Sequence, residues 1–519
     1  MESNYSPNTQ KTSEVLIAGP GTIIFFISTL YLLRLVLIST LPLAPDEAYY
    51  WYWSTHPDWS YFDHPPMVAY LMAIATNLGG NREVFVRLGG YLSTIVTLFC
   101  IYGSYRVLFR HRSEKQGLDV LFLLNITLLF SAGCIVQTPD TPMLLFWSLA
   151  LLAGACIVSY NAKWAWYFLG VSLGLGLLSK YTMILFVPCF YGFLFLSRDQ
   201  RIWLKHKEPY LALLIAVLIF SPVIYWNFSH HWTSFSYQLK QGFSSIPKGI
   251  LEKMGEYLGG QAGVVTPLLF LSFLLYGIRA LSVATRSDRP ACLYLAALSW
   301  PIFLFFALSS VKGKVSEANW PAPTYIAGFI LMWHAYANYY HFRKMHRRFM
   351  KVGIILAIIA NLLISVHLVR PFLPIPVSLD NTRQFCGWPL LGYQIEKTIE
   401  SHPSTKPYFM LSDKGTTIAE AVFYSHGKYA GFDYTFPARY SFLGNIKSQR
   451  GYNAVIMLHQ PREQAIKFMK PYFRDVLFVG QHIPVYRGEE IQDLSLSLFL
   501  GFDFLFESPF LKPTDGLVQ

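Results

Sequence analysis

Long apolar runs are the feature that most limits what this chain can fold into. The first covers residues 15–41, and similar runs recur along the chain as far as residue 369. About 18 or more apolar residues in a row form a helix that spans the hydrocarbon core of a bilayer. Only 14% of the residues are charged, whereas about a quarter are charged in soluble proteins. The sequence therefore predicts a polytopic α-helical membrane protein.

Window length predicts about eleven transmembrane helices within residues 15–370. Lys180 stands between two of them, either as the turn between two spans or as a buried charge in a broken one. The first run has no small-residue cleavage site, so we expect an uncleaved anchor that follows a cytoplasmic tail, residues 1–14. The expected spans are 15–41, 86–109, 118–137, 141–160, 164–179, 181–197, 209–227, 264–282, 291–311, 321–340 and 352–369.

Lysines and arginines gather in four clusters between the runs, and these clusters indicate the orientation of the chain. Residues 371–519 contain 14 basic and 14 acidic residues, so the net charge of +12 belongs to residues 1–370. With a cytoplasmic N-terminus all four clusters fall on the cytoplasmic side, as the positive-inside rule requires. No basic stripe lies on a soluble domain, so we expect no nucleic-acid partner. The clusters are Arg106, Arg110, Arg112 and Lys115; Arg198, Arg201, Lys205 and Lys207; Arg279, Arg286 and Arg289; and Arg343, Lys344, Arg347, Arg348 and Lys351.

The same orientation places the remaining loops together on the outer side of the membrane. Ionisable residues gather there near span ends, where a charge is costly to hold and is therefore a functional candidate. Snorkelling to the interface is the ordinary alternative. The aromatic, amphipathic stretch 228–262 fits either an interfacial helix or a plain loop. The outer ionisable residues are Asp46, Glu47, Asp63, His64, Asp140, Lys180, Lys312, Lys314 and Glu317.

Residues 45–66, PDEAYYWYWSTHPDWSYFDHPP, combine acids, a histidine and aromatic rings in the first outer loop, 42–85. Asp46 or Glu47 can act as the general base for an acceptor hydroxyl or amine. Acids with a histidine, such as Asp63 and His64, can hold a divalent metal. N-capping of a short interfacial helix is the structural alternative for the first two acids.

Cations and aromatic rings on this side add to the same chemistry. Lysine and arginine can neutralise a phosphate leaving group. Aromatic rings can stack on sugar faces, although an interfacial belt is their commoner role. Such a set suits a transferase that uses a lipid-phosphate donor, and it also suits an ion-coupled transporter. The rings in question are Tyr49, Tyr50, Trp51, Trp53 and Trp59.

Residues 371–519 change character and predict a small extracytoplasmic α/β domain. Short apolar runs alternate there with amphipathic ones, which is typical of a βαβαβ arrangement. The secondary structure of the residues after 488 is not apparent from their pattern. Strands are expected at 408–412, 453–459 and 475–487, and helices at 416–427 and 461–473.

Several of these segments together resemble bacterial polyprenyl-phosphate-sugar glycosyltransferases of the GT-C type. This family contains the protein O-mannosyltransferases (glycosyltransferase family 39) and the lipid A aminoarabinose transferases. The resemblance covers most of the chain, and it is strongest in the first outer loop and in the NWPAP stretch. The matching segments are PDEAYYWYW, WSYFDHPPMVAYL, QTPDTPMLLFWSLAL at 137–151, GLGLLSKYTMILF at 174–186, KGKVSEANWPAPTYIA at 312–327 and AEAVFYSHGK at 419–428.

The resemblance implies roles for the acids of the first loop. Asp46 matches the first acid of the family's Asp-Glu pair and takes the catalytic general-base role. Glu47 matches the second, which orients the site or assists a metal. Asp63 stands where the lipid A enzymes have an acid linked to metal binding, so a divalent metal ion is a possible cofactor. His64 replaces their lysine, which puts its contact with the donor phosphate in doubt because histidine is mostly neutral at pH 7.

The resemblance also implies contacts by residues beyond the acids and the histidine of the first outer loop. Lys180 and Lys314 are the candidates for the donor phosphate. Arg87 matches a common arginine after the loop, and it either joins the phosphate site or anchors the loop. The remaining substrate-binding candidates include Asn319, which could instead cap the following span. These candidates are Asp140, Glu317, Asn319 and Tyr50.

Taken together, these features predict an inverting glycosyltransferase of the bacterial inner membrane. It would move a sugar from a polyprenyl phosphate to an acceptor outside the cytoplasm, either lipid A, another glycolipid or a protein. Lipopolysaccharide modification and protein glycosylation are both open, and the sugar is not readable from the sequence. The competing hypotheses are a lipid-linked glycan transporter or flippase, and a polymer ligase or an oligosaccharyltransferase-like enzyme. We find no internal repeat of the kind that many transporters show.

Overall fold

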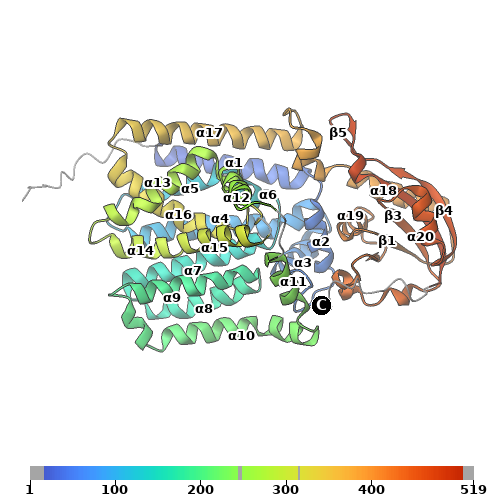
Figure 1. Ribbon diagram of the computed structural model, residues 1–519, viewed down its shortest axis with the longest axis horizontal. Helices are drawn as coiled ribbons and strands as arrows, with labels where there is room; N and C mark the ends of the chain where they lie inside the picture. Colours follow the sequence, from blue (N-terminus) through green and yellow to red (C-terminus); the bar gives the residue numbers. More distant parts are fainter. Residues whose placement is uncertain (1–16, 244–247, 314–315, 506–519) are drawn as a thin grey trace, which may run out of the picture.

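A computed structural model describes residues 17–243, 248–313 and 316–505. The chain forms two units, a long helical bundle and an α/β unit attached to one end of it (Figure 1). The expected cytoplasmic tail, residues 1–14, lies outside the described residues. The site described below lies where the two units meet.

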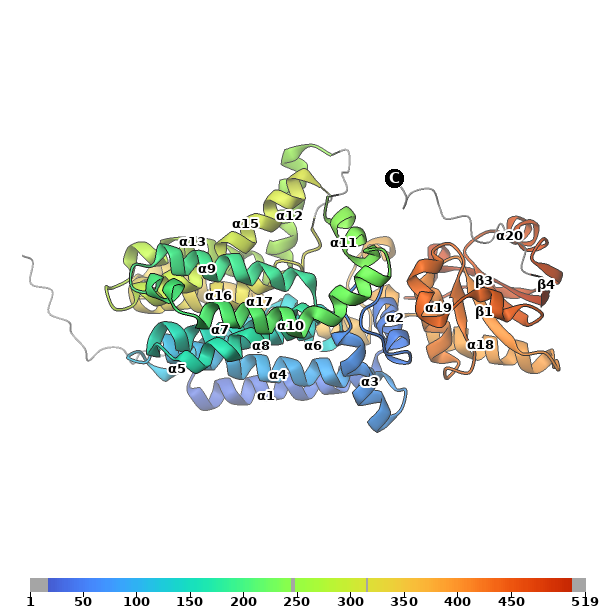
Figure 2. The same ribbon diagram turned by 90° about the horizontal axis from the view of Figure 1, so that it is seen from below.

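The helical unit contains seventeen α-helices among the described residues, which run mostly along the long axis of the molecule (Figures 1 and 2). The helices are α1 (Pro20–Thr40), α2 (Pro45–Ser54), α3 (Met67–Gly79), α4 (Glu83–Leu108), α5 (Glu114–Asn125), α6 (Leu128–Ile135), α7 (Asp140–Tyr160), α8 (Lys163–Leu177), α9 (Phe186–Leu196), α10 (Glu208–Ser229), α11 (Thr233–Phe243), α12 (Ile250–Val265), α13 (Pro267–Val283), α14 (Arg289–Ala297), α15 (Trp300–Lys312), α16 (Ala322–Ala335) and α17 (Lys344–Val369).

Six helical segments in the described part of the chain are long and apolar enough to cross a membrane, and up to eight if each bent pair counts as one span. Large apolar side chains such as Phe25, Phe99 and Phe195 remain exposed on the bundle. In water such a surface would aggregate, but in a bilayer it faces lipid. The chain is a multi-pass membrane protein, as the sequence predicted.

Each of the eleven expected spans coincides with a helix or with a broken helix, but the number of crossings stays a prediction. Residues 118–137 fall on α5 and α6, which meet at a bend of 73°. Lys180 lies between α8 and a short 3₁₀ helix, η1 (Tyr181–Leu185), that leads into α9. The residue therefore lies at a turn between two helices and is also buried, so both of the expected alternatives describe part of what is found.

The amphipathic stretch after α10 forms two helices, α11 and α12, instead of one interfacial helix. α12 meets α13 at an angle of 104°. In Figure 2 α12 stands out from the bundle, and α11 lies beside α2 near the α/β unit. α11 contributes several side chains to the site, which the sequence did not indicate.

The α/β unit is a five-stranded mixed sheet in the order β2-β1-β3-β7-β4. β1 runs parallel to β2 and β3, and β7 runs antiparallel to β3 and β4. β5 and β6 form a separate antiparallel pair. The elements are α18 (Trp388–Ser401), β1 (Tyr408–Ser412), α19 (Gly415–Tyr424), β2 (Gly431–Asp433), β3 (Asn453–Leu458), α20 (Arg462–Met469), β4 (Phe473–His482), β5 (Val485–Tyr486), β6 (Glu489–Glu490) and β7 (Leu496–Phe504).

All three expected strand ranges contain strands, and both expected helices are present, with boundaries within a few residues. The expected simple βαβαβ order is incomplete, because β7 inserts between β3 and β4. β7 lies in the residues after 488, whose secondary structure was not apparent from the sequence. It is apolar on both faces, since LSLFLGFDF lies in the middle of the sheet and packs against helices on each side. Two-sided burial removes the alternation by which a strand is recognised.

α2 lies between the two units and joins them through its aromatic face. Trp51 packs edge-on against Phe423 of α19, with ring centroids 4.8 Å apart. The Tyr52 hydroxyl accepts a hydrogen bond of 2.9 Å from the Gly431 backbone N–H. These rings share one apolar cluster with α18, α19 and one face of the sheet. α20 covers the opposite face of the sheet.

A buried polar contact holds the end of the last long helix to the α/β unit. The His367 Nδ1 atom, in the last turn of α17, accepts hydrogen bonds from the backbone N–H groups of Phe372 and Leu373. Its Nε2 atom must then carry the proton, and it donates to Asp380 Oδ2 at 2.7 Å. The Tyr486 hydroxyl donates to the same oxygen at 2.7 Å. This contact fixes where the chain leaves the bundle.

Candidate active site

A cavity of about 890 Å³ is lined by residues of both units. Its lining comes from α2 and the loop after it, from the turn at residues 138–140, from the turn at Lys180, from α11 and from residues 305–320. The α/β unit adds Gly415, Thr416 and Arg439. The loops that the charge pattern placed on one side of the membrane therefore gather around a single space.

The lining separates into a charged part and an apolar part. The apolar part comes largely from η1, α10, α11 and α15, whereas the charges come from helix ends and loops. Three apolar lining residues, Ile184, Val217 and Phe305, are also about half exposed. The charged lining residues are Asp46, Asp63, His64, Asp140, Lys180, Glu317 and Arg439, and the apolar ones include Leu177, Ile184, Leu185, Val217, Phe220, Phe235, Leu239, Phe305 and Phe306.

Asp46 presents an open carboxylate to this cavity. It is the second residue of α2, it is exposed, and it lines the cavity. Its carboxylate makes no hydrogen bond or ion pair with any residue that the structure describes. Although solvent reaches this residue, the cavity walls around it displace part of the water near its carboxylate; this desolvation and then the charge of Asp63 raise the pKa of Asp46, while Arg439 acts in the opposite direction. An unpartnered carboxylate with a raised pKa is suited to accept a proton.

Glu47, its neighbour, has a different environment and does not line the cavity. It is fully buried and forms an ion pair with Arg87, with hydrogen bonds of 2.8 Å and 2.6 Å to the two carboxylate oxygens. It also accepts from the backbone N–H groups of Ala44 and Gln137. The bond from Ala44 caps the start of α2, which is the structural alternative expected for this acid.

Arg87 is likewise placed away from the expected phosphate site. Its guanidinium donates to the carbonyl oxygens of Leu41 and Pro42, both at 2.7 Å, besides its bonds to Glu47. The side chain is buried and absent from the cavity lining. In this structure Arg87 anchors the loop after α1 and does not face the donor site. Glu47 holds α2, the helix that carries Asp46.

Asp63 lies on one wall of the cavity and is held by two residues. Its Oδ2 atom accepts a hydrogen bond of 2.7 Å from the Tyr49 hydroxyl. Its Oδ1 atom is 3.1 Å from Arg439 Nη2. Burial raises the pKa of Asp63, and Arg439 opposes this effect. The Gln238 side chain, from α11, donates to the Asp63 carbonyl at 2.6 Å.

Arg439 is a functional candidate that sequence reasoning missed. It lies on a short 3₁₀ helix, η6 (Pro437–Leu443), of the α/β unit. Its Nη2 atom donates to the Tyr237 hydroxyl at 2.6 Å. Burial acts to lower the pKa of the guanidinium, but Asp63, Tyr49 and Tyr237 together outweigh this effect, and the pKa is raised. The only sequence signal is one arginine among aromatic residues, and that signal does not tell which space the arginine faces.

The opposite wall holds Asp140 and Lys180, both expected at the site. Lys180 Nζ donates to both Asp140 oxygens, at 2.7 Å and 2.8 Å. The Asn319 side chain donates to Asp140 at 2.9 Å. Lys180 and Asp140 are both buried, and the Lys180 ammonium lies 6.0 Å from the centre of the Trp320 ring. This cluster belongs entirely to the helical unit.

His64 and Tyr50 lie in the lining together with both charged pairs. Burial and then the charges of Lys180 and Arg439 lower the pKa of His64 to about 3. The ring is therefore neutral at pH 7, so His64 can contact a phosphate only through a neutral N–H group. The Tyr50 ring lies edge-on to it, with centroids 6.1 Å apart. Burial raises the pKa of Tyr50, which keeps its hydroxyl protonated.

The outcome for the remaining expected residues differs. Glu317 and Asn319 both line the cavity. Lys314 lies outside the described residues. The loop aromatics divide: Tyr49 and Tyr50 line the cavity and Trp59 is exposed, whereas Trp51 and Trp53 are buried, and Trp53 stacks on Tyr61 with centroids 4.4 Å apart.

A resident metal ion has no evident set of ligands in this arrangement. The described residues contain no group of three or more His, Cys, Asp or Glu side chains placed to hold one. Asp63, the expected ligand, is engaged by Tyr49 and Arg439, and Glu47 is engaged by Arg87. A metal requirement stays a prediction from the sequence, and no step below depends on it.

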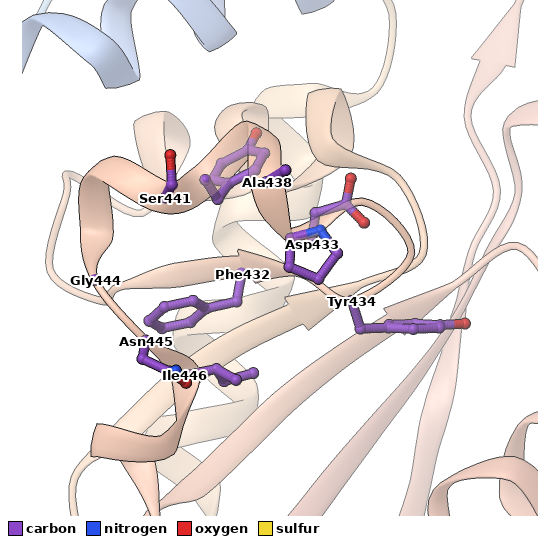
Figure 3. Close-up of a pocket in the computed structure, with 10 residues that line it drawn as sticks. Phe432, Asp433, Tyr434, Ala438, Ser441, Gly444, Asn445 and Ile446 are labelled. Carbon is purple, nitrogen blue, oxygen red and sulfur yellow. The ribbon is translucent and has the colours of Figure 1, made fainter. Parts of the chain in front are cut away.

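A second, smaller cavity of about 370 Å³ lies within the α/β unit beside η6 (Figure 3). Ala438 and Ser441 of η6 line it, whereas Arg439 lines the large cavity. Asp433 accepts hydrogen bonds from the backbone N–H groups of two residues that precede η6. The Tyr440 hydroxyl donates to the Gly415 carbonyl at 2.5 Å. These contacts fix the segment that carries Arg439.

Comparison with known proteins gives the relatives of this chain. Residues 63–226 match the family model described as dolichyl-phosphate-mannose-protein mannosyltransferase. The lipid A galacturonosyltransferase RgtD of Rhizobium johnstonii is 26% identical over 57% of this chain and 61% of its own length. The undecaprenyl phosphate-alpha-4-amino-4-deoxy-L-arabinose arabinosyl transferase of Yersinia pestis is 26% identical over 62% of this chain and 59% of its own length. The chain thus matches about three fifths of the length of each relative.

Solved structures show that the fold is also shared. The crystal structure of ArnT from Cupriavidus metallidurans in the apo state superposes with a TM-score of 0.63 at 15% identity, over 92% of this chain and 98% of that one. The same protein bound to undecaprenyl phosphate gives 0.63 at 14% identity, over 93% and 98%. In sequence this chain is therefore similar to these glycosyltransferases, and its fold is that of ArnT.

Proposed function

We propose that the protein is an inverting glycosyltransferase that moves a sugar from a polyprenyl phosphate to an acceptor. One observation carries this proposal: an unpartnered carboxylate, Asp46, faces the same cavity as a buried lysine, a partly exposed arginine and an extended apolar wall. The charged part suits a phosphate and a sugar, and the apolar wall suits the first isoprene units. The half-exposed residues Ile184, Val217 and Phe305 would let the prenyl chain continue into the bilayer.

In the proposed reaction Asp46 removes the proton from an acceptor hydroxyl or amine. The acceptor oxygen or nitrogen forms a bond to the anomeric carbon while the bond from that carbon to the phosphate oxygen breaks, with inversion. The products are the glycosylated acceptor and polyprenyl phosphate, and the proton remains on Asp46 until water removes it. Lys180 stabilises the charge that develops on the leaving phosphate. Positioning of the two substrates supplies the rest of the rate.

The cellular setting follows from the same proposal. The basic clusters lie toward the end of the bundle far from the α/β unit: Arg112 and Asp288 form an ion pair of 2.6 Å, and α14 lies at that end (Figure 1). With a cytoplasmic N-terminus and about eleven spans in residues 15–370, the cavity and the α/β domain of residues 371–519 face the periplasm of an inner membrane. The name of the RgtD relative supports lipid A as the acceptor.

The test is transfer by the purified protein reconstituted with a polyprenyl-phosphate sugar and lipid A. Asp46→Asn is expected to reduce kcat by about 10²- to 10⁴-fold without a change in folding, because it removes a general base. Asp58→Asn is the matched control: Asp58 belongs to the same loop, but it bonds Trp226 and lies outside the cavity lining. Near-normal turnover by the Asp46 variant would overturn the proposed mechanism.

The same assay separates the competing functions. A transferase releases one free polyprenyl phosphate for each sugar that it moves, whereas a flippase releases none. The mass of the accepted donor then distinguishes a single sugar from a preassembled glycan, which a polymer ligase or an oligosaccharyltransferase-like enzyme would use.

A further inference from the structure

We infer that Arg439, delivered by the α/β unit, is a phosphate-binding residue of the cavity, and that Asp63 holds its guanidinium only until a lipid phosphate replaces it. This inference rests on the proposed function and adds a residue to its donor site. It makes the α/β unit part of the donor site, although the bundle forms most of the cavity.

The guanidinium has hydrogen-bonding capacity that the protein does not use. Arg439 has five N–H donors, and in the described residues only its Nη2 atom has partners, Tyr237 and Asp63. Its Nε atom is buried without a hydrogen-bond partner. The side chain is 34% exposed and lines the cavity. A planar fork with free donors matches the geometry of a phosphate.

The contact between Arg439 and Asp63 is weaker than the other two ion pairs near the site. It is a single N–O contact of 3.1 Å, from Arg439 Nη2 to one oxygen of Asp63. Arg87 and Glu47 are joined by two hydrogen bonds, and so are Lys180 and Asp140. When the guanidinium turns to a phosphate, Asp63 keeps its 2.7 Å hydrogen bond from Tyr49. The exchange therefore leaves no carboxylate without a partner.

The charges of the cavity favour a second cation at the phosphate. The described lining contains Asp46, Asp63 and Asp140 beside two basic residues, Lys180 and Arg439. These acids repel an anionic phosphate that enters the space, and each cation that faces it attracts it. Lys180 is held by both oxygens of Asp140, which Asn319 fixes in turn. Arg439 is the cation that can change partners at the smaller cost.

The segment that carries Arg439, η6, is held in place, so the guanidinium stays beside the cavity when it exchanges Asp63 for a phosphate. η6 is fixed by the bond from Tyr440 to Gly415. A side chain at position 415 would collide with the Tyr440 ring, since a Cβ there would lie 2.8 Å from it. The guanidinium also lies 5.2 Å from the centre of the Phe436 ring and 5.5 Å from that of Tyr237. These rings guide the side chain toward the cavity whether or not Asp63 holds it.

The experiment compares binding of undecaprenyl phosphate and of phosphate-free undecaprenol, followed by the intrinsic fluorescence of the detergent-solubilised protein, which includes Trp320 in the cavity lining. Arg439→Gln is expected to weaken binding of the phosphate about 10- to 100-fold and to leave binding of the alcohol unchanged. Arg383→Gln is the matched control, because Arg383 of the same unit pairs with Asp493 outside the cavity. Equal losses for both ligands, or no loss, would overturn the inference.

Asp63→Asn provides a second, independent test with the opposite sign. If Asp63 competes for Arg439, its neutralisation is expected to tighten phosphate binding by about 3-fold or more, since the free guanidinium is more populated. If the pair merely ties the two units together, binding weakens instead, and the exchange is refuted. A wild-type protein that does not prefer the phosphate to the alcohol would refute the proposed donor itself. A preference that Arg439→Gln retains would refute only the role of Arg439.

Discussion

The two charged walls of the cavity are built in different ways. On one wall Asp140, Lys180 and Asn319 all come from the helical unit, and they are joined by three hydrogen bonds of 2.7–2.9 Å. On the other wall Asp63 comes from the helical unit and Arg439 from the α/β unit, at 3.1 Å. Both walls pair an acid with a cation, yet one exists as soon as the bundle has folded and the other requires two units to meet.

This difference suits the two acid–cation pairs to different roles in the reaction. A buried pair with both oxygens engaged is expensive to open, so it is suited to keep its geometry through a reaction. A partly exposed pair across a joint is cheaper to open, so it is suited to exchange partners when a substrate enters. Asp46 can serve as a base between them because neither cation is bound to it.

The first prediction would break the tightly held wall. Asp140→Asn leaves the buried Lys180 ammonium without a counter-charge, and we expect the free energy of unfolding in detergent to fall by about 3–5 kcal/mol. Asp63→Asn, the matching change on the other wall, is expected to cost about 1 kcal/mol or less, because Arg439 is one third exposed. Denaturant unfolding of both variants measures the contrast. Similar losses would show that the two walls do not differ as described.

The second prediction sharpens the loosely held wall through the pH dependence of kcat/KM. Asp46 must be ionised to act as a base, so activity is lost as the pH falls through its raised pKa. The charge of Asp63 raises this pKa and that of Arg439 lowers it, with smaller effects from Glu47 and Lys414.

Arg439→Gln should therefore move the acid limb of the profile to higher pH, and Asp63→Asn should move it to lower pH. Rate measurements across the acid limb, with substrate well below KM, give both shifts. Shifts in the same direction would show that Asp46 is not the group that titrates.

The smallest effect concerns metal. Because Asp63 and Glu47 are engaged by Arg439 and Arg87, we expect thorough chelation to change the transfer rate less than about twofold, as in the absence of a Lewis-acid step. The measurement is the initial rate after dialysis against EDTA, with Mg²⁺ or Mn²⁺ added back as the control. A large loss that a metal restores would show that Asp63 leaves Arg439 for a metal during turnover.

The sequence predicted well what depends on composition along the chain. Apolar runs located the helices and basic clusters indicated the loops between them, so Asp46, Asp140 and Lys180 were correctly expected close together. It predicted poorly what depends on partners distant in sequence. Glu47 and Arg87 had the right residue types for a site, but the two side chains pair with each other, although they are 40 residues apart in the sequence. Nothing in the local pattern shows whether a charge is already paired.

Arg439 shows most clearly what could not be predicted from the sequence. It lies 376 residues after Asp63 in an irregular segment without hydrophobic periodicity, and η6 is too short for a pattern to indicate a face. The aromatic loop illustrates the reverse error. Its tryptophans suit a sugar platform or a membrane belt by type, but the burial of Trp51 against Phe423 of α19 depends on the fold of the α/β unit.

The position of α2 has a consequence for the making of the protein. The Tyr52 hydroxyl and the Gly431 N–H that it binds are 379 residues apart, so the aromatic face of α2 has no cover while most of the chain is still being translated. At about 5–20 residues per second the ribosome needs on the order of 20 to 80 s to supply that cover. During this interval the inserted bundle displays Asp46 beside an unfinished wall. On the proposed function, a chain that stalls or is cut before Arg439 would then occupy the membrane with an incomplete donor site.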